Sequence, residues 1–215
     1  MKTRYFLMLA VLIVSLGGCR FWGVRGSGDI ETEERNVEEF NAISASGAFE
    51  IRVNVGEEES LSVTADDNLL RYIVTKVRNG KLIIDSKRNL SPRRDIVITI
   101  TAKDLKMVEA SGACDIFVEN INNDYFEVDM SGASDIKLQG NTNKFLIDLS
   151  GAGNVDAKNL IAKDVRVSLS GASDASVHAT ESLDAEVSGV GSVDYYGDPD
   201  KVVTDVSGVG SINRK

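Results

Sequence analysis

The chain has 215 residues, of which 42% are hydrophobic but only 6% are aromatic, and its formal net charge is −9. This length fits one domain of repeat type or at most two small ones, with a core lined mainly by aliphatic side chains. The acidic charge, without any Lys/Arg cluster, argues against nucleic acid as a partner. Nineteen glycines beside two prolines indicate many tight bends.

The N-terminus has the pattern of an export signal. Lys2 and Arg4 precede an apolar run over residues 6–16 that is short for a membrane span. Small residues then precede Cys19, an arrangement that resembles the lipobox of bacterial lipoproteins. By that resemblance residues 1–18 are a signal peptide, and Cys19 becomes the lipidated first residue of the mature chain. The alternative is an ordinary secretory signal with a chance cysteine.

Residues 19–35 contain several glycines and glutamates but no sustained apolar period. We therefore expect a flexible tether between the membrane and the domain that follows. Several acyl chains on Cys19 would hold the protein firmly at a membrane. The expected location is the cell envelope, at the periplasmic or surface face of the outer membrane.

The first part of the domain, residues 36–105, predicts an irregular β region. Residues 50–55 alternate polar and apolar, as a half-buried strand does. Residues 66–68 predict the start of a short helix, and Asn79-Gly80 predicts a two-residue hairpin turn. This region is either three degenerate rungs with insertions or a distinct β cap for the end of a solenoid.

One phrase occurs once in the first part of the domain and repeats through residues 106–215: Ser-Gly-Ala-x-Asp/Asn followed by an apolar-x-apolar step. Its copies begin at Ser46, Ser111, Ser131, Ser150, Ser170, Ser188 and Ser207. From the second copy onward they are 18 to 20 residues apart. A period of this length indicates a stack of repeated structural units, and it does not by itself indicate a functional site.

Each repeat has the pattern of two strands and a corner. The residues before each Ser alternate apolar and polar, and apolar residues follow at the fifth and seventh positions after it. The Gly is expected to adopt a backbone conformation closed to other residues, and the small residue after it is expected inside the corner. Stacking such units buries a common core. The sequence thus predicts an all-β fold, a parallel β-helix or β-solenoid with rungs of about 19–20 residues, right-handed by the general crossover rule.

Two columns of polar residues are candidate outer-face binding surfaces. The column four residues after the Ser contains Asp115, Asp135, Asn154 and Asp174, and the column two residues before it contains Glu109, Asp129, Asp148, Glu186 and Asp205. The first column suits a calcium or sugar ladder, or else hydrogen bonds to the bend backbone; no metal is expected, because calcium-binding nonapeptides are absent. The second suits a cation or partner, or else a solvated face that prevents aggregation.

Catalytic motifs are absent from the sequence. His178 is the single histidine, and there is no nucleophile elbow, Cys/His pair or phosphate-binding loop. The repeated serines recur in every rung, whereas a catalytic serine should be singular. With Cys19 lipidated, Cys114 is the only other thiol, and it takes a position held by small residues in other copies, so a packed side chain is expected. We expect no enzyme and no cofactor.

Several features together carry a family resemblance: the lipobox, the strand 49–53, the stretch 68–84 and the Ser-Gly-Ala-x-Asp-Ile repeats. With them the chain resembles the auto-transporter adhesin family with a head GIN domain, common among lipoproteins of Bacteroidetes-type bacteria. The resemblance runs from about Val37 to Ile212. It implies a β-helical cell-envelope protein with adhesion as its inferred role, and it supplies no catalytic residues.

Our leading hypothesis is a non-enzymatic β-solenoid, anchored to the membrane through Cys19, that binds a glycan or protein partner through its outer faces. The alternative is an envelope scaffold that forms homo-oligomers through the last rung at residues 206–212. A carbohydrate-active β-helix enzyme is a third hypothesis, which rests on analogy of fold alone.

Overall fold

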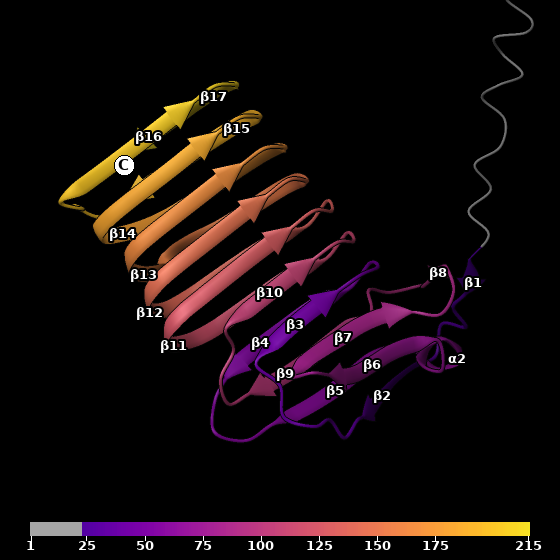
Figure 1. Cartoon of the computed structure of the whole chain (residues 1–215). Helices are drawn as coiled ribbons and strands as arrows, with labels where there is room; N and C mark the ends of the chain where they lie inside the picture. The colour runs from indigo at the N-terminus through magenta and orange to yellow at the C-terminus, as the bar shows by residue number, and fades with distance from the viewer. Residues whose placement is uncertain (1–22) are drawn as a thin grey trace, which may run out of the picture.

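The structure, a computed structural model, describes residues 23–215, so the predicted signal peptide and the predicted lipidation site at Cys19 lie outside the described residues. It is almost entirely β, with one four-residue helix, α2 (Asp67–Leu70). Figure 1 shows a regular stack of coils that ends at β17 and a broader N-terminal part at the opposite end. Within residues 23–215 no helix is long and apolar enough to span a membrane.

Parallel pairing between successive coils builds the regular stack. Its strands are β10 (Met107–Ala110), β11 (Asp115–Met130), β12 (Asp135–Leu149), β13 (Ala152–Leu169), β14 (Ala172–Val187), β15 (Val190–Tyr196), β16 (Lys201–Val206) and β17 (Val209–Arg214). Equivalent positions lie side by side, so that Val128 pairs with Ile147 and Ile147 with Val167. The predicted parallel β-solenoid is confirmed, with about five turns.

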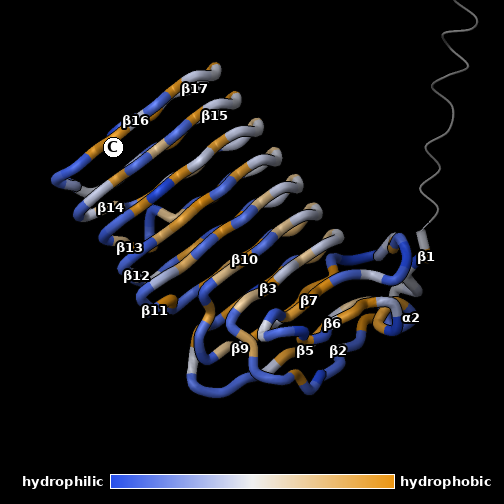
Figure 2. Tube along the Cα trace, viewed as in Figure 1, coloured by the Kyte–Doolittle hydropathy of each residue, from blue (hydrophilic) through white to orange (hydrophobic). Residues whose placement is uncertain are grey.

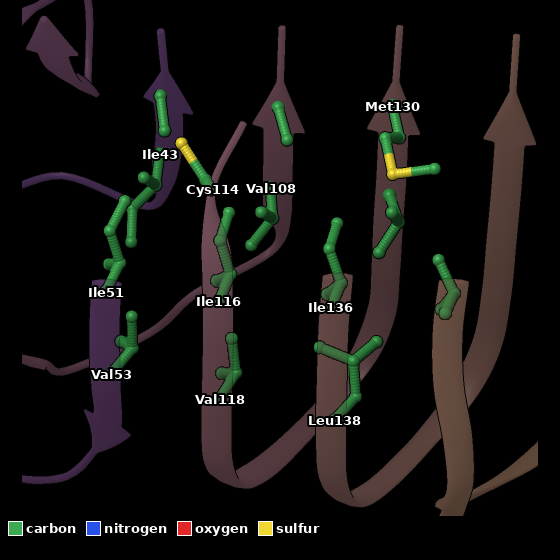
Figure 3. Close-up of a cluster of buried hydrophobic side chains, with 14 of the residues drawn as sticks. Ile43, Ile51, Val53, Val108, Cys114, Ile116, Val118, Met130, Ile136 and Leu138 are labelled. Carbon is green, nitrogen blue, oxygen red and sulfur yellow. The ribbon is translucent and has the colours of Figure 1, made fainter. Parts of the chain in front are cut away.

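The core is a set of aliphatic columns inside the coil. Figure 2 shows the alternation of hydrophobic and hydrophilic residues along each strand, which sends every second side chain inward. In Figure 3, Ile116 and Val118 of one coil point into the same interior as Ile136 and Leu138 of the next. All four are buried. Because a single coil has no hydrophobic interior of its own, its stability depends on its neighbours.

The N-terminal region combines rungs and a cap. Two further rungs consist of β3 (Ala42–Ala45) with β4 (Glu50–Val55), and of β7 (Lys81–Ser86) with β9 (Val97–Ala102), all in parallel register with the stack. Antiparallel strands then cover the end: β6 (Ile73–Arg78) on β7, β5 (Ser60–Asp66) on β9, and β2 (Ile30–Glu34) on β5. Both alternatives for this region are therefore partly right.

The predicted helix start and hairpin are both found. The helix α2 begins after Asp66. Asn79 and Gly80 join β6 to β7 with φ values of 51° and 73°. Positive φ at both central residues is the geometry of a type I′ turn, and it explains the Asn-Gly pair.

The expectation of a flexible tether over residues 19–35 is wrong for most of the described part. Strand β1 (Val24–Arg25) pairs with β8 (Leu90–Ser91), and β2 pairs with β5. The sequence of β2 hides this strand because all five of its residues are exposed, so no apolar alternation marks it. The first described strand therefore begins at Val24, within the stretch expected to be a tether.

Asp66 fastens this N-terminal segment to the domain. Its side chain is fully buried and accepts hydrogen bonds from the backbone N–H groups of Gly28 (2.7 Å) and Arg93 (3.0 Å). It does not cap α2. The carboxylate instead joins two loops that are far apart in sequence.

We expect Asp66→Ala to lower the free energy of unfolding by about 2 kcal/mol, because two backbone N–H groups lose their shared acceptor, the buried carboxylate. Urea unfolding monitored by circular dichroism measures this difference. The matched control is Asp95→Ala, which removes an exposed carboxylate and should change stability little. Equal effects of the two substitutions would contradict the role of Asp66.

The stacked corners explain the repeated glycines differently from the sequence prediction. Of the glycines in the Ser-Gly corners, only Gly47 has φ in the left-handed region. A Cβ on Gly132 would lie 2.0 Å from the carbonyl oxygen of Gly112, and one on Gly151 would lie 1.9 Å from that of Gly132. Each of these corners needs glycine because the coil before it leaves no room for a side chain.

The inside of the corner is also one residue further on than predicted. The residue after the Gly is exposed, as at Ala113 and Ala133, whereas the next position is buried, as at Cys114 and Ser134. The Ser134 hydroxyl donates to the carbonyl oxygen of Gly112 (3.2 Å), so this buried polar group is satisfied. Cys114 is fully buried, which confirms a packed side chain there, and this burial raises the pKa of its thiol.

Candidate functional site

The column after the corners is a continuous ladder on the outer face. Asp115 pairs with Asp135, Asp135 with Asn154, and Asn154 with Asp174. Carboxylates of this column accept hydrogen bonds from the next coil. Asp135 accepts hydrogen bonds from the backbone N–H (3.1 Å) and the side-chain amide (2.9 Å) of Asn154. Asp174 accepts from the backbone N–H and hydroxyl of Ser192, both at 2.7 Å. This geometry favours the structural interpretation of the column over ligand binding.

The column before the corners is a second ladder, on the other sheet of the coil. Its register runs through Glu109, Asp129, Asp148, Ser168, Glu186 and Asp205. Lys81 forms an ion pair with Glu109 at one end. Burial, followed by the nearby carboxylates of Asp148 and Glu109, raises the pKa of Asp129. The two predicted columns are separated by the corners and do not form one site.

Because its pKa is raised in the folded state, the ionised Asp129 costs stability at neutral pH, and the cost disappears as the pH falls below the ordinary aspartate pKa. We expect Asp129→Asn to raise the free energy of unfolding by about 0.5 kcal/mol at neutral pH. The gain should vanish below about pH 4, where the wild-type carboxyl is also neutral. Unfolding titrations across this range measure it, with Asp200→Asn as an exposed control. A gain that persists in acid would contradict this explanation.

The sequence analysis missed a polar groove on the edge of the coil opposite the Ser-Gly corners. The groove has a volume of about 490 Å³ and crosses the bends of successive coils. It is lined by Asn122, Asn123, Asp124, Asn141, Thr142, Asn143, Ile161, Ala162, Lys163 and Thr180. We call it the asparagine groove. Its volume lies within the ~300–1,000 Å³ typical of small-molecule sites.

Strand register places the groove residues in columns. Asn122 lies beside Asn141, and Asn141 beside Ile161. In the adjacent column, Asn123 lies beside Thr142 and Thr142 beside Ala162. Successive members of a column are about 4.8 Å apart, the spacing of paired strands. The groove is therefore polar on the coils of β11 and β12 and turns apolar at Ile161 and Ala162 of β13.

The floor of the groove is held by hydrogen bonds between coils. The Thr142 hydroxyl donates to the side-chain Oδ1 of Asn123 (2.7 Å), and the side-chain amide of Asn143 donates to the Asp124 carboxylate (2.5 Å). Asn123 also donates to the backbone carbonyl of Leu105 (2.7 Å). Among residues 23–215, by contrast, no partner atom binds the exposed amides of Asn122 and Asn141. Two amides that have no hydrogen-bond partner among the described residues thus extend from a surface that hydrogen bonds between coils hold in place.

One signal in the sequence marks this groove. Residues 122–124 and 141–143 both place asparagine midway between corners, in consecutive repeats. Alignment on the Ser-Gly phrase leaves these residues as ordinary turn residues, because asparagine is common in turns for local reasons. Only the register of the coils shows that they stack into one surface.

A second, smaller groove lies near the capped end. It has a volume of about 370 Å³ and is lined by Glu50, Arg52, Val53, Asn54, Thr99, Phe117 and Glu119. Phe117 is 40% exposed there. Arg52 and Glu50 pair with each other at 2.5 Å, so their charges are largely satisfied within the protein.

The single histidine and the tyrosine with a raised pKa line neither groove. His178 lies 3.3 Å from the backbone carbonyl of Lys158. The hydrogen bond that Tyr125 donates to Glu127 raises the Tyr125 pKa to about 12, which keeps the phenol neutral. In the described part of the chain, no three His, Cys, Asp or Glu residues are placed to hold a metal ion.

Comparison with known proteins agrees with this fold. A solved "putative adhesin" from Bacteroides fragilis NCTC 9343 is 28% identical, with a TM-score of 0.74 over 90% of this chain and 100% of that chain. Two structures from Parabacteroides distasonis ATCC 8503 share the fold. A "putative adhesin" is 21% identical (TM-score 0.61, 90% and 100% covered), and a "putative lipid binding protein" is 23% identical (TM-score 0.56, 89% and 99% covered). No curated protein matches the chain in sequence.

The family model described as "Putative auto-transporter adhesin, head GIN domain" matches residues 39–199. These residues include both irregular rungs and nearly all of the regular stack. The match covers well over half of the chain. The chain therefore belongs to the auto-transporter adhesin, head GIN domain family.

Proposed function

We propose that this protein is a lipid-anchored, non-enzymatic component of the cell envelope that adheres to partners by binding a carbohydrate in the asparagine groove. The single observation that carries the proposal is the pair of free amides at Asn122 and Asn141, side by side on a braced floor. Membership in an adhesin family supports an envelope location and a binding role.

The chemistry of the groove suits sugar hydroxyls. A carboxamide offers two N–H donors and a carbonyl acceptor, and a sugar hydroxyl both donates and accepts. Two stacked amides can therefore bind neighbouring hydroxyls of one ring. Ile161, 45% exposed in the same column, offers an apolar surface to the ring's C–H groups. Lys163, on the groove wall, carries a positive charge that an acidic sugar would share with Glu181, which lies 3.9 Å away.

The position of the groove supports display away from a membrane. Figure 1 shows that the described chain begins beside β1, at the capped end of the molecule. The groove lies further along the stack, on the coils of β11 to β14. A lipid at Cys19 would hold the capped end near the membrane and leave the groove accessible.

A glycan array probed with residues 23–215 tests the carbohydrate proposal. We expect binding that is reduced roughly tenfold or more in the variant Asn122→Ala/Asn141→Ala, because each lost hydrogen bond to a ligand costs about 1 kcal/mol. The control Asn36→Ala/Asn89→Ala removes two exposed amides outside the groove and should bind normally. No bound glycan, or equal binding by both variants, would overturn the proposal.

Lipid anchoring is tested separately from glycan binding. In cells of a Gram-negative bacterium, the full chain should partition with membranes and carry acyl groups detectable by mass spectrometry. Cys19→Ser should release it into the soluble fraction. Membrane partitioning that Cys19→Ser leaves unchanged would contradict the anchor.

A further inference from the structure

The two ends of the solenoid are finished differently. At the N-terminal end, the antiparallel strands β2, β5 and β6 cover the terminal rung, which consists of β7 and β9. At the C-terminal end, β16 pairs only with β14 and β17 only with β15, so each leaves one backbone edge without a strand among residues 23–215. Figure 1 shows these two strands as the last layer of the stack. An uncovered edge of this kind is a template for pairing with another strand.

The open end also exposes the core. In the preceding coil, the inward-facing Leu183 and Val187 are 1% and 0% exposed. Their register partners in the last coil, Val202 and Val206, are 44% and 43% exposed. Each of these valines, being a little under half exposed, forgoes a little under half of the ~1.5–3 kcal/mol that full burial of such a side chain provides.

We propose that a second copy of this chain covers the C-terminal end, with β16 pairing antiparallel to β16 of that copy in a register centred on Val203. A two-fold axis midway between the two Val203 residues, normal to the sheet, reverses the strand and keeps each sheet aligned with its counterpart. The same rotation brings β17 opposite the second copy's β17. Both interiors are then closed, and the capped ends point outward, so the assembly stops at two copies.

The charges of β16 select this occupant and this register. With Val203 opposite Val203 of the second copy, Lys201 lies opposite Asp205 of that copy, and the pair occurs twice by symmetry. In the structure of residues 23–215 neither Lys201 nor Asp205 has an ion-pair partner. Inward-facing Val202 then lies opposite Thr204, so the apolar interior continues across the interface. Opposite charges on facing strand positions favour pairing, whereas like charges oppose it.

Sedimentation of residues 23–215, which contain every described strand, tests the proposal. We expect the wild-type chain to reach twice the mass of one copy. Lys201→Asp or Asp205→Lys alone sets like charges opposite one another twice and should weaken dimerisation roughly tenfold or more. The swap Lys201→Asp/Asp205→Lys restores both pairs and should restore the dimer. A wild-type mass of one copy, larger multiples, or a swap as weak as the single variants would overturn the proposal.

Cross-linking tests the register without relying on stability. In the proposed register, Val203→Cys places a thiol opposite the same thiol of the second copy. Mild oxidation should therefore produce a covalent dimer, while the buried Cys114 stays unreactive. The control is Arg166→Cys, at the equivalent exposed outward position in the middle of the stack. Equal cross-linking of the two variants, or none by Val203→Cys, would overturn the pairing.

Discussion

Gly151→Ala should lower the free energy of unfolding by about 3 kcal/mol. The new methyl carbon would lie 1.9 Å from the carbonyl oxygen of Gly132. That oxygen already accepts a hydrogen bond from the backbone N–H of Ala152 (2.9 Å). The two coils must therefore separate at the corner, and the hydrogen bond between them is lost. Chemical denaturation of residues 23–215 measures the effect.

Gly56→Ala is the matched control for this substitution. A Cβ at Gly56 would meet its nearest neighbours at 3.3 and 3.4 Å, and both are side-chain atoms. We expect a change within about 0.5 kcal/mol, as for ordinary surface substitutions. A similar loss at both positions would mean that the cost arises from glycine itself and not from the stacked corner.

Phe145→Ala should cost about 4 kcal/mol, the usual result of emptying an aromatic site in a core. Phe145 and Phe126 are both fully buried in adjacent coils, with ring centroids 6.2 Å apart. Aromatic residues are only 6% of the chain, so the aliphatic neighbours on both sides cannot fill the space that one ring leaves. Thermal and denaturant unfolding measure the loss.

Phe117→Ala provides the comparison, because Phe117 is on the outer face and 40% exposed. Its removal should cost less than about 1 kcal/mol. If Phe117→Ala destabilised the protein as much as Phe145→Ala, the assignment of inward and outward rows would be contradicted.

The fold could be predicted from the sequence because its determinants are local and repeated. Alternation around each Ser defines the strands, and the constant period requires equivalent residues to stack. The Asn79-Gly80 turn is specified by two residues alone. By contrast, the order of the N-terminal rungs could not be predicted: β7 and β9 follow β3 and β4 in sequence, yet lie beyond them in the stack. Only long-range pairing determines that order.

The details of the corner could not be predicted for a related reason. Glycine is compatible both with an unusual backbone conformation and with close approach of another chain segment. The sequence does not separate these explanations at Gly132 or Gly151, and the structure decides for close approach. The buried carboxylate of Asp66 is likewise invisible in sequence, because its partners are backbone groups of distant loops.

The candidate site could be predicted from the sequence even less well than the corners. The two predicted acidic columns exist as ladders, but their strongest contacts are with neighbouring coils. Asn122 and Asn141 differ from them because their amides are free within the described residues. An alignment on the Ser-Gly corners does not single out these two asparagines, because they belong to the variable part of each repeat.

We propose that recognition occurs at the asparagine groove and not at the repeated Ser-Gly edge. It is tested most directly by measuring how residues 23–215 bind the best glycan from the array, using two double variants. Ser131→Ala/Ser150→Ala alters two exposed serines on the corner edge, and Asn122→Ala/Asn141→Ala alters the groove. If the groove binds the glycan, the serine variant should bind like the wild type and the asparagine variant should lose binding. Loss of binding by the serine variant alone would contradict it.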